Sequence, residues 1–325
     1  MKVLVTGGAG FIGSHIVDAL LRKGHGVVVL DNFFTGKQEN LAHVKDKIKI
    51  VEGDIRELNL LKLLCKDTDA ILHQAALRSV PVSLKDARPY NEVNATGTYN
   101  VLEAARINNV KRVVLASSSS VYGTEKTLPL REELAGNAVR TSPYAITKFT
   151  GEDYARFFAN VYGLSAVSLR YFNVFGPRQD PKSEYATVIP RFILGVASNQ
   201  SPTIFGHGNQ RLDFTYVDNI VHANILGLEA KHLAGEAVNV GNGKNTSVNE
   251  LFEKVCQVVG KKVTPLRAPF RFPGEDRNTL ADLSFAKTVL GFEREVDFEE
   301  GLKRTVAFFI CRKSSARTPW TLVRG

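Results

Sequence analysis

The chain has 325 residues, of which 44% are hydrophobic and 23% charged, so it can bury one large or two modest cores. Its net charge of +9 comes from basic residues scattered through amphipathic segments, and the sequence has no nucleic-acid-binding motif, so we expect no nucleic-acid partner. No apolar run reaches about 18 residues, so we expect no membrane partner. Three widely spaced cysteines, Cys65, Cys256 and Cys311, exclude a disulfide framework and a metal-ligand cluster and favour a reducing, cytoplasmic location.

The first half of the chain alternates short apolar runs with amphipathic segments of helical period, which predicts a parallel sheet covered by helices. The predicted strands are residues 2–6, 27–30, 48–51, 70–72, 113–116 and 166–170. The predicted helices are residues 11–23, 58–64, 89–108 and 143–162, the last opening with Ser142-Pro143. The expected fold class is therefore α/β, a Rossmann-type doubly wound parallel sheet with a smaller C-terminal substrate-binding domain.

The pattern becomes less regular after residue 172, where proline, glycine and loop-like segments increase. We expect residues 1–172 to form a dinucleotide-binding domain and residues 173–325 to form mainly a substrate-binding domain. Two later stretches, 213–229 and 237–240, again resemble a helix and a strand. We therefore expect a return to the sheet over about residues 213–241.

A glycine-rich turn, GGAGFIG over residues 7–13, follows the first strand and opens the first helix. The spacing of Gly7, Gly10 and Gly13 is a variant of the dinucleotide fingerprint, in which the backbone approaches a pyrophosphate at a helix N-terminus. Asp31 ends the second strand about 20 residues later, where its carboxylate binds a ribose and repels a 2′-phosphate, so NAD is favoured over NADP. Asp54-Ile55, after the third strand, suits an adenine contact.

Tyr144 and Lys148 lie four residues apart at a helix start, a spacing that puts both side chains on one helical face. Tyrosine alone is a poor base, with a pKa of about 10, but a nearby ammonium and an oxidised nicotinamide both favour its phenolate. A run of four serines, residues 117–120, follows the strand at 113–116. A Tyr-x-x-x-Lys pair alone is weak evidence, but after the glycine-rich turn and a strand that ends in serines it is strong evidence of a catalytic pair.

At this point the chain resembles an extended short-chain dehydrogenase/reductase, and most closely the UDP-hexose 4-epimerases. The similar segments run from residue 6 to about residue 290 and include HQAALRSVP (73–81), NATGT (94–98) and RYFNVFGPR (170–178). The form HQAAL-x-SVP is especially similar to epimerases that act on UDP-N-acetylhexosamines. The substrate domain is accordingly expected to bind a nucleotide sugar.

The resemblance implies roles for three catalytic residues. Ser118 is the family's catalytic hydroxyl, counted three residues before the valine of Val121-Tyr122-Gly123. Tyr144 would remove the C4-hydroxyl proton while a hydride passes to NAD, and Ser118 would hydrogen-bond that oxygen. Lys148 would bind the nicotinamide ribose and tune Tyr144, and the 4-keto sugar would turn over and take the hydride back on its other face.

The remaining site residues are also assigned by the fingerprint and the resemblance. The expected cofactor-binding residues are Gly7, Gly10, Phe11, Ile12, Gly13, Asp31, Asn32, Asp54, Ile55, Ala75, Asn94, Tyr144 and Lys148. The expected substrate-binding residues are Arg78, Ser118, Ser119, Tyr144, Asn173, Val188, Arg211, Arg271, Arg277 and Thr279. No metal site is expected.

Two of these arginines are displaced by one position from the family pattern: Arg211 in QRLDF (210–214) and Arg271 in RFPGEDR (271–277). The family uses such arginines as a diphosphate clamp, whose bidentate geometry is sensitive to such shifts. Thr279 falls where the family varies a residue beside the sugar, and a small residue there admits an N-acetyl group. We therefore expect UDP-N-acetylglucosamine to fit as well as UDP-glucose.

Other functions remain as alternatives: a 4,6-dehydratase, a UDP-glucuronate 4-epimerase, a 3β-hydroxysteroid-type dehydrogenase or a non-catalytic NAD sensor. A dehydratase places an Asp-Glu pair after the catalytic hydroxyl, but this chain has Ser119-Ser120. The segment DFTYVDN (213–219) with His222 is similar to the steroid branch, although HQAAL-x-SVP favours nucleotide sugars. A sensor would lack the Tyr/Lys pair.

We interpret His73, at a strand end, as structural rather than catalytic. Relatives commonly dimerise through two long helices from each subunit, so the resemblance implies a homodimer formed by residues 89–108 and 143–162.

Overall fold

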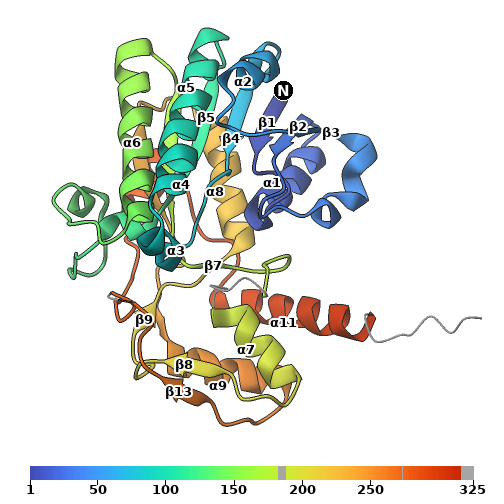
Figure 1. Cartoon of the computed structure of the whole chain (residues 1–325), viewed down its shortest axis with the longest axis vertical. Helices are drawn as coiled ribbons and strands as arrows, with labels where there is room; N and C mark the ends of the chain where they lie inside the picture. The colour runs from blue at the N-terminus through green and yellow to red at the C-terminus, as the bar shows by residue number, and fades with distance from the viewer. Residues whose placement is uncertain (182–187, 273, 316–325) are drawn as a thin grey trace, which may run out of the picture.

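The computed structural model describes residues 1–181, 188–272 and 274–315. Its centre is a seven-stranded sheet in the order β11-β6-β5-β4-β1-β2-β3, with every pair parallel (Figure 1). The strands are β1 (Lys2–Thr6), β2 (Gly26–Asp31), β3 (Lys49–Glu52), β4 (Ala70–His73), β5 (Arg112–Ser118), β6 (Ala166–Tyr171) and β11 (Glu236–Val240). The six strands predicted in the first half are confirmed with ends shifted by at most two residues, and the predicted late strand returns to the sheet edge.

Apolar side chains on alternate residues supply one core on each face of the sheet, as expected for strands that are covered on both sides. Val3 and Val5 of β1 pack with α1 (Phe11–Arg22) and α8 (Val217–Glu229). Leu4 packs on the opposite face, under α2 (Leu58–Cys65), α5 (Gly97–Ile107) and α6 (Pro143–Tyr162). Because the strands bury apolar side chains on both faces of the sheet, helices pack on both faces, which is the doubly wound arrangement.

Two helical predictions need correction, and one further helix is not predicted by the sequence. The stretch predicted as one helix, 89–108, is divided into α4 (Arg88–Tyr90), a π-turn, η3 (Asn91–Thr96), and α5. The helix predicted from 213 begins only at Val217, because Asp213 accepts backbone N–H groups from other segments and β10 (Thr215–Tyr216) pairs with β7 (Val174–Phe175). A further helix, α3 (Val80–Lys85), is capped by Ser79, whose hydroxyl accepts from the Val82 N–H.

A smaller lobe lies beyond the carboxyl ends of the strands (Figure 1). Its helices are α7 (Val188–Ala197), α9 (Val248–Val259) and α11 (Phe298–Ser315), which pack on one another. Its strand pairs are β8 (Thr203–Phe205) with β13 (Leu266–Ala268) and β9 (Arg211–Leu212) with β12 (Thr246–Ser247). The remaining elements are η1 (Gln38–Asn40), η2 (Ala42–Lys47), η4 (Ser119–Tyr122), η5 (Glu132–Ala135) and α10 (Ser284–Leu290).

Candidate active site

A cavity of about 1490 Å³ separates the carboxyl edge of the sheet from the smaller lobe. It is lined on one side by the ends of β1, β2, β5 and β6 and on the other by residues such as Phe205, Leu212 and Arg271. Open α/β sheets bind ligands at this edge. The cavity is larger than the roughly 300–1,000 Å³ of ordinary small-molecule pockets, so it has room for more than one small ligand.

The glycine-rich turn leaves no room for side chains beneath the N-terminus of α1. Gly7 has φ +69°, and a Cβ there would lie 2.6 Å from the Ala75 nitrogen. A Cβ on Gly13 would overlap the Gly7 carbonyl oxygen. The bare backbone and the helix N-terminus therefore form a cradle of the kind that binds a dinucleotide pyrophosphate.

Asp31 is placed beside this cradle at the end of β2. Its carboxylate accepts hydrogen bonds from the Ala9 and Phe33 N–H groups at 2.9 Å each, and it lines the cavity. Burial raises the pKa of Asp31, while the two N–H donors lower it. A carboxylate held in this position can accept ribose hydroxyls and would repel a 2′-phosphate, which fits NAD rather than NADP.

The far end of the cavity on this side carries Asn32, Asp54 and Ile55. Asn32 donates a hydrogen bond of 2.9 Å to Asp54. The Arg56 guanidinium, hydrogen-bonded to the same carboxylate, lowers the pKa of Asp54 to about 2, so this group stays ionised. Asp54 and Ile55, which the sequence assigns to an adenine contact, thus line the same end of the cavity as Asn32.

Ser118, Tyr144 and Lys148 meet in the middle of the cavity wall. Ser142 caps α6 by accepting from the Ala145 N–H at 3.2 Å, and this fixes the turn that carries Tyr144. Burial raises the pKa of Tyr144, while a hydrogen bond with Ser118 and the charge of Arg78 lower it. Lys148 donates to the Ala116 carbonyl at 2.8 Å, and burial lowers its pKa to about 8.

The four serines have different surroundings. Ser118 accepts a hydrogen bond of 2.9 Å from the Ser120 hydroxyl, and both line the cavity. The Ser119 carbonyl accepts from Arg277 at 3.2 Å. Ser117 turns away and donates to Glu152 at 2.5 Å. The run therefore spans the last two residues of β5, Ser117 and Ser118, and the first two of η4, Ser119 and Ser120.

Most of the expected substrate-binding residues also reach the cavity: Arg78, Ser118, Ser119, Tyr144, Asn173, Val188, Arg271, Arg277 and Thr279. Thr279 is almost fully buried, and its hydroxyl accepts hydrogen bonds of 3.0 Å from the Asn173 side chain and the Asp213 N–H. Arg271 stacks over Phe205 at 4.4 Å and pairs with Glu275. Thr279 and Asn173 are thus rigidly placed, whereas Arg271 is engaged by its own neighbours.

Two expected site residues are not among those that line the described cavity. Arg211 points to Glu250, 3.0 Å away, and to Asn245, because its one-residue displacement puts it on the other side of β9 from its cavity-lining neighbours. Asn94 is buried, accepts from the Leu77 N–H at 2.8 Å and donates to the Leu77 carbonyl at 2.9 Å. It therefore supports the cavity wall through Leu77, which lines the cavity.

Lys37 and Arg178 are cavity-lining cations to which the sequence analysis assigned no role. Lys37 pairs with Asp180 at 3.1 Å, and Arg178 pairs with Asp18 of α1 at 2.7 Å. Arg178 stands at φ +65°, an unusual conformation for a residue with a Cβ. The signal that could have found it is a charged residue directly after Gly176-Pro177, in the segment quoted for the family resemblance.

His73 is buried between two hydroxyls, with Thr6 Oγ1 at 2.7 Å from Nδ1 and Thr98 Oγ1 at 3.0 Å from Nε2. Burial lowers the pKa of His73 to about 3, so the ring is neutral at physiological pH. A neutral, fully bonded ring agrees with the structural role expected from the sequence.

This protonation state predicts a pH-dependent loss of stability. The unfolded pKa of histidine, about 6.5, exceeds the folded one, so the stabilisation is complete above pH 6.5 and falls as the pH drops toward 3. Between pH 7 and pH 5 the loss is about 2 kcal/mol of unfolding free energy. Urea unfolding at pH 7 and pH 5 measures this loss of unfolding free energy. The loss should be smaller in His73→Gln than in the wild type by about this amount. His207→Gln, in an exposed loop, serves as control, and equal losses in wild type and His73→Gln would contradict the assignment.

The fold and the glycine cradle with Asp31 are those of a Rossmann-type dinucleotide-binding protein, and Ser118, Tyr144 and Lys148 face the same cavity. The chain belongs to the NAD dependent epimerase/dehydratase family, whose sequence model matches residues 3–241. It is 42% identical over 306 residues to a putative UDP-glucose 4-epimerase of Methanocaldococcus jannaschii, covering 94% of this chain and 97% of the relative.

Solved structures agree with this placement. A UDP-N-acetylglucosamine 4-epimerase from Methanobrevibacter ruminantium M1, in complex with UDP-N-acetylmuramic acid, superposes with a TM-score of 0.90 at 42% identity, covering 96% of this chain and 98% of that one. A Thermus thermophilus UDP-glucose 4-epimerase in complex with NAD superposes with a TM-score of 0.86 at 36% identity, covering 95% and 99%. NAD is the cofactor of this family, and no helix in the described part of the chain is long and apolar enough to cross a bilayer.

Proposed function

We propose that this protein is a UDP-hexose 4-epimerase that interconverts UDP-glucose and UDP-galactose and also accepts UDP-N-acetylglucosamine and UDP-N-acetylgalactosamine. The observation that carries the proposal is that Ser118, Tyr144 and Lys148, the last two one helical turn apart on α6, line the same cavity as the glycine cradle. Ser119 and Ser120 stand where a dehydratase needs an acid and a base, and neither hydroxyl titrates near neutral pH. This argues against elimination of water.

The chemistry follows from the residues present. Tyr144, as phenolate, takes the proton from the sugar C4 hydroxyl, and Ser118 donates a hydrogen bond to that oxygen. Bound NAD supplies the hydride acceptor and returns the hydride to the opposite face of the 4-keto sugar. Tyr144 then gives its proton back to the oxygen. Lys148 holds positive charge beside this proton transfer, which favours the phenolate.

The sugar side of the proposal rests on Thr279. Its small side chain lines the cavity, and its hydroxyl is tied to Asn173 and to the Asp213 N–H, so it cannot swing into the space beside the sugar. A threonine at this place leaves room for an N-acetyl group. Arg277 lies at the same wall and donates to the Gly123 carbonyl at 3.0 Å, which supports a place for it in the substrate site.

We expect coupled assays to show C4 inversion of both UDP-galactose and UDP-N-acetylgalactosamine, with kcat/KM values within roughly tenfold of each other. The reason is that a site with room for the larger substituent discriminates weakly against the smaller one. Thr279→Ser should keep both activities, because it retains the hydroxyl that holds Asn173. Turnover of the plain hexose without any turnover of the N-acetylated sugar would contradict the sugar assignment.

We further propose that the active form is a homodimer that pairs α5 and α6 with their copies. These helices expose large apolar side chains: Tyr99, Ile107, Ile146, Phe157, Val161 and Tyr162. Such residues on neighbouring helices form an apolar surface of the kind that marks an interface. In the same proposal, residues 1–172 with the return over about 213–241 bind NAD, and the rest of 173–325 binds the sugar nucleotide.

A further inference from the structure

A buried ion pair lies directly behind the catalytic lysine. Glu152 is on α6 one helical turn after Lys148, and its carboxylate receives two hydrogen bonds from Arg170 of β6, at 2.9 and 2.7 Å. The side chains of Glu152 and Arg170 are 0% and 3% exposed. Removing two charges from water is costly, and such pairs are weak evidence for stability alone, so a role beyond stability is worth seeking.

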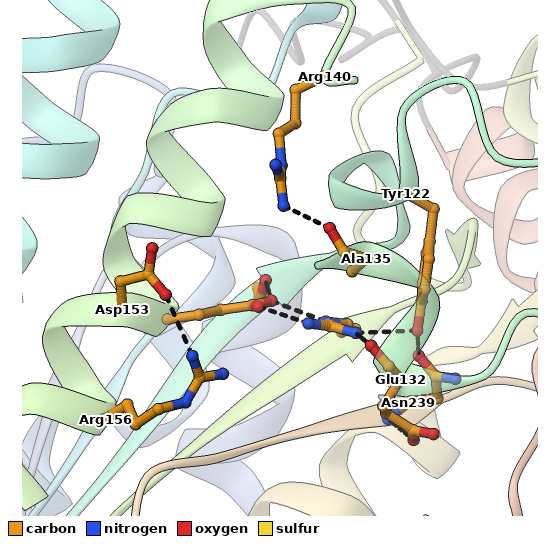
Figure 2. A network of polar contacts seen from close by, with 10 residues as sticks. Tyr122, Glu132, Ala135, Arg140, Asp153, Arg156 and Asn239 are labelled. Carbon is orange, nitrogen blue, oxygen red and sulfur yellow. Dashed lines mark hydrogen bonds and ion pairs between the residues drawn. The ribbon is translucent and has the colours of Figure 1, made fainter. Parts of the chain in front are cut away.

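The pair is fixed from several sides, and Figure 2 shows its surroundings, with Tyr122, Glu132 and Asn239 labelled. Ser117 of β5 donates to Glu152 at 2.5 Å. Arg170 also donates to the Tyr122 hydroxyl at 3.0 Å and to the Glu132 carbonyl at 2.8 Å, and Tyr122 donates to Asn239 at 2.6 Å. The network thus ties α6 to β5, β6 and β11, and the carboxylate has little freedom to move.

Glu152 and Lys148 face the same small space. An internal cavity of about 10 Å³ is lined by both side chains and by Ser117, Ser168 and His73. The buried Ser168 hydroxyl, which borders it, has no hydrogen-bond partner among the described residues. A space of this size holds about one water, so bulk solvent does not screen the lysine from the carboxylate.

The other charged and titratable groups around Lys148 do not replace this carboxylate. His73 of β4 is neutral, and the residues that end β5, Ser117 and Ser118, carry no charge. Tyr144 and Arg78 lie toward the main cavity, and Arg170 is positive. Glu152 is the nearby negative charge, and it opposes the effect of burial on the pKa of Lys148.

We propose that Glu152 is a positioning residue for catalysis: held by Arg170 and Ser117, it keeps a fixed negative charge behind Lys148, so that the lysine stays an ammonium ion and sustains the Tyr144 phenolate. Without that charge Lys148 loses its proton at a lower pH, and Tyr144 then titrates at a higher pH. In this reading Ser117 aims the carboxylate while Ser118 acts on the sugar. The inference rests on the proposed catalytic roles of Tyr144 and Lys148.

The test is a pH titration of the Tyr144 phenolate in the NAD-loaded protein, read from near-ultraviolet absorbance. Each variant is compared with the same variant carrying Tyr144→Phe, so that only Tyr144 contributes to the difference. Glu152→Gln should raise the apparent pKa of Tyr144 by about one unit, because Lys148 then loses its proton at a lower pH and no longer stabilises the phenolate. Glu152→Asp, which keeps the charge, should restore most of the wild-type value.

The matched control is Asp153→Asn, the same chemical change one residue along α6. Asp153 pairs with Arg156 at 3.3 Å, and both side chains are about half exposed (Figure 2). This variant should leave the Tyr144 titration unchanged. Glu152→Gln leaves the buried guanidinium of Arg170 without its carboxylate. The double variant Glu152→Gln/Arg170→Gln has no such unpaired charge, and it should shift the pKa of Tyr144 in the same direction.

Equal Tyr144 pKa values in wild type and both Glu152 variants, or equal shifts in Glu152→Gln and Asp153→Asn, would overturn the inference. The titration needs no sugar, so its outcome is separate from that of the epimerase assay. If the protein fails to invert any UDP-sugar but the titration shifts as described, the proposed function fails and the role of Glu152 stands.

Discussion

Replacing Tyr144 by phenylalanine is expected to lower the kcat of C4 inversion by at least about 100-fold, the lower end of the range for a lost general acid–base group. The reason is that, in the proposed mechanism, this hydroxyl takes and returns the C4 proton, while Ser118 and Lys148 assist it. The phenyl ring keeps the packing against Tyr90, whose ring centre lies 6.4 Å away. NAD content and the unfolding transition should therefore match the wild type.

The matched control for this variant is Tyr90→Phe. Tyr90 also lines the cavity, but its hydroxyl donates to the Ser79 carbonyl at 2.7 Å and holds the start of α3. Its loss should lower kcat by less than about tenfold, because only a neutral hydrogen bond of about 1 kcal/mol is removed. Residual activity in Tyr144→Phe above one tenth of wild type, or an equal loss in Tyr90→Phe, would contradict the assignment of Tyr144.

Replacing Gly13 by alanine is expected to abolish co-purification of NAD and to lower the free energy of unfolding by about 2–4 kcal/mol. The added Cβ would overlap the Gly7 carbonyl and crowd Gly8, both of which are backbone and cannot rotate away. The turn must therefore open, and the cradle for the pyrophosphate is lost. Nicotinamide released on denaturation measures the first effect, and urea unfolding measures the second.

Gly24→Ala separates cofactor binding from backbone strain. Gly24 has φ +75° but nothing lies within 4 Å of an added Cβ, so the variant carries only the left-handed penalty of about 1–2 kcal/mol. It should keep the wild-type NAD content. If Gly13→Ala retains NAD at wild-type stoichiometry, the glycine-rich turn is not the pyrophosphate site.

The sequence predicts the sheet well, and the residues that it assigns to the cofactor end lie along one cavity, because both features depend on local patterns. The alternation of apolar residues marks the strands, and the turn at residues 7–13 and the carboxylate of Asp31 occur at set distances along the chain. The Tyr144/Lys148 pair needs only helical spacing to be placed on one face. The return of β11 to the sheet is also visible as a short apolar run, Ala237–Val240.

The parts that the sequence could not predict depend on contacts between distant residues. Asn94 belongs to a quoted motif, yet its amide is used to hold Leu77. Arg211 is recruited by Glu250, a residue of the capping box that opens α9, and this partner is not visible from the motif around it. The contact between Glu152 and Arg170 spans 18 residues and two elements, so only the fold brings it behind Lys148.

Hydrogen transfer at the sugar C4 tests the central claim most directly. UDP-galactose carrying deuterium at C4 is incubated with the NAD-loaded protein, and the products are examined by mass spectrometry and NMR. Because the hydride leaves and returns on the same bound nicotinamide, we predict UDP-glucose that retains deuterium at C4, with no net reduction of the nicotinamide. A product whose C4 hydrogen comes from solvent, or an oxidised sugar formed in step with reduced nicotinamide, would contradict the account.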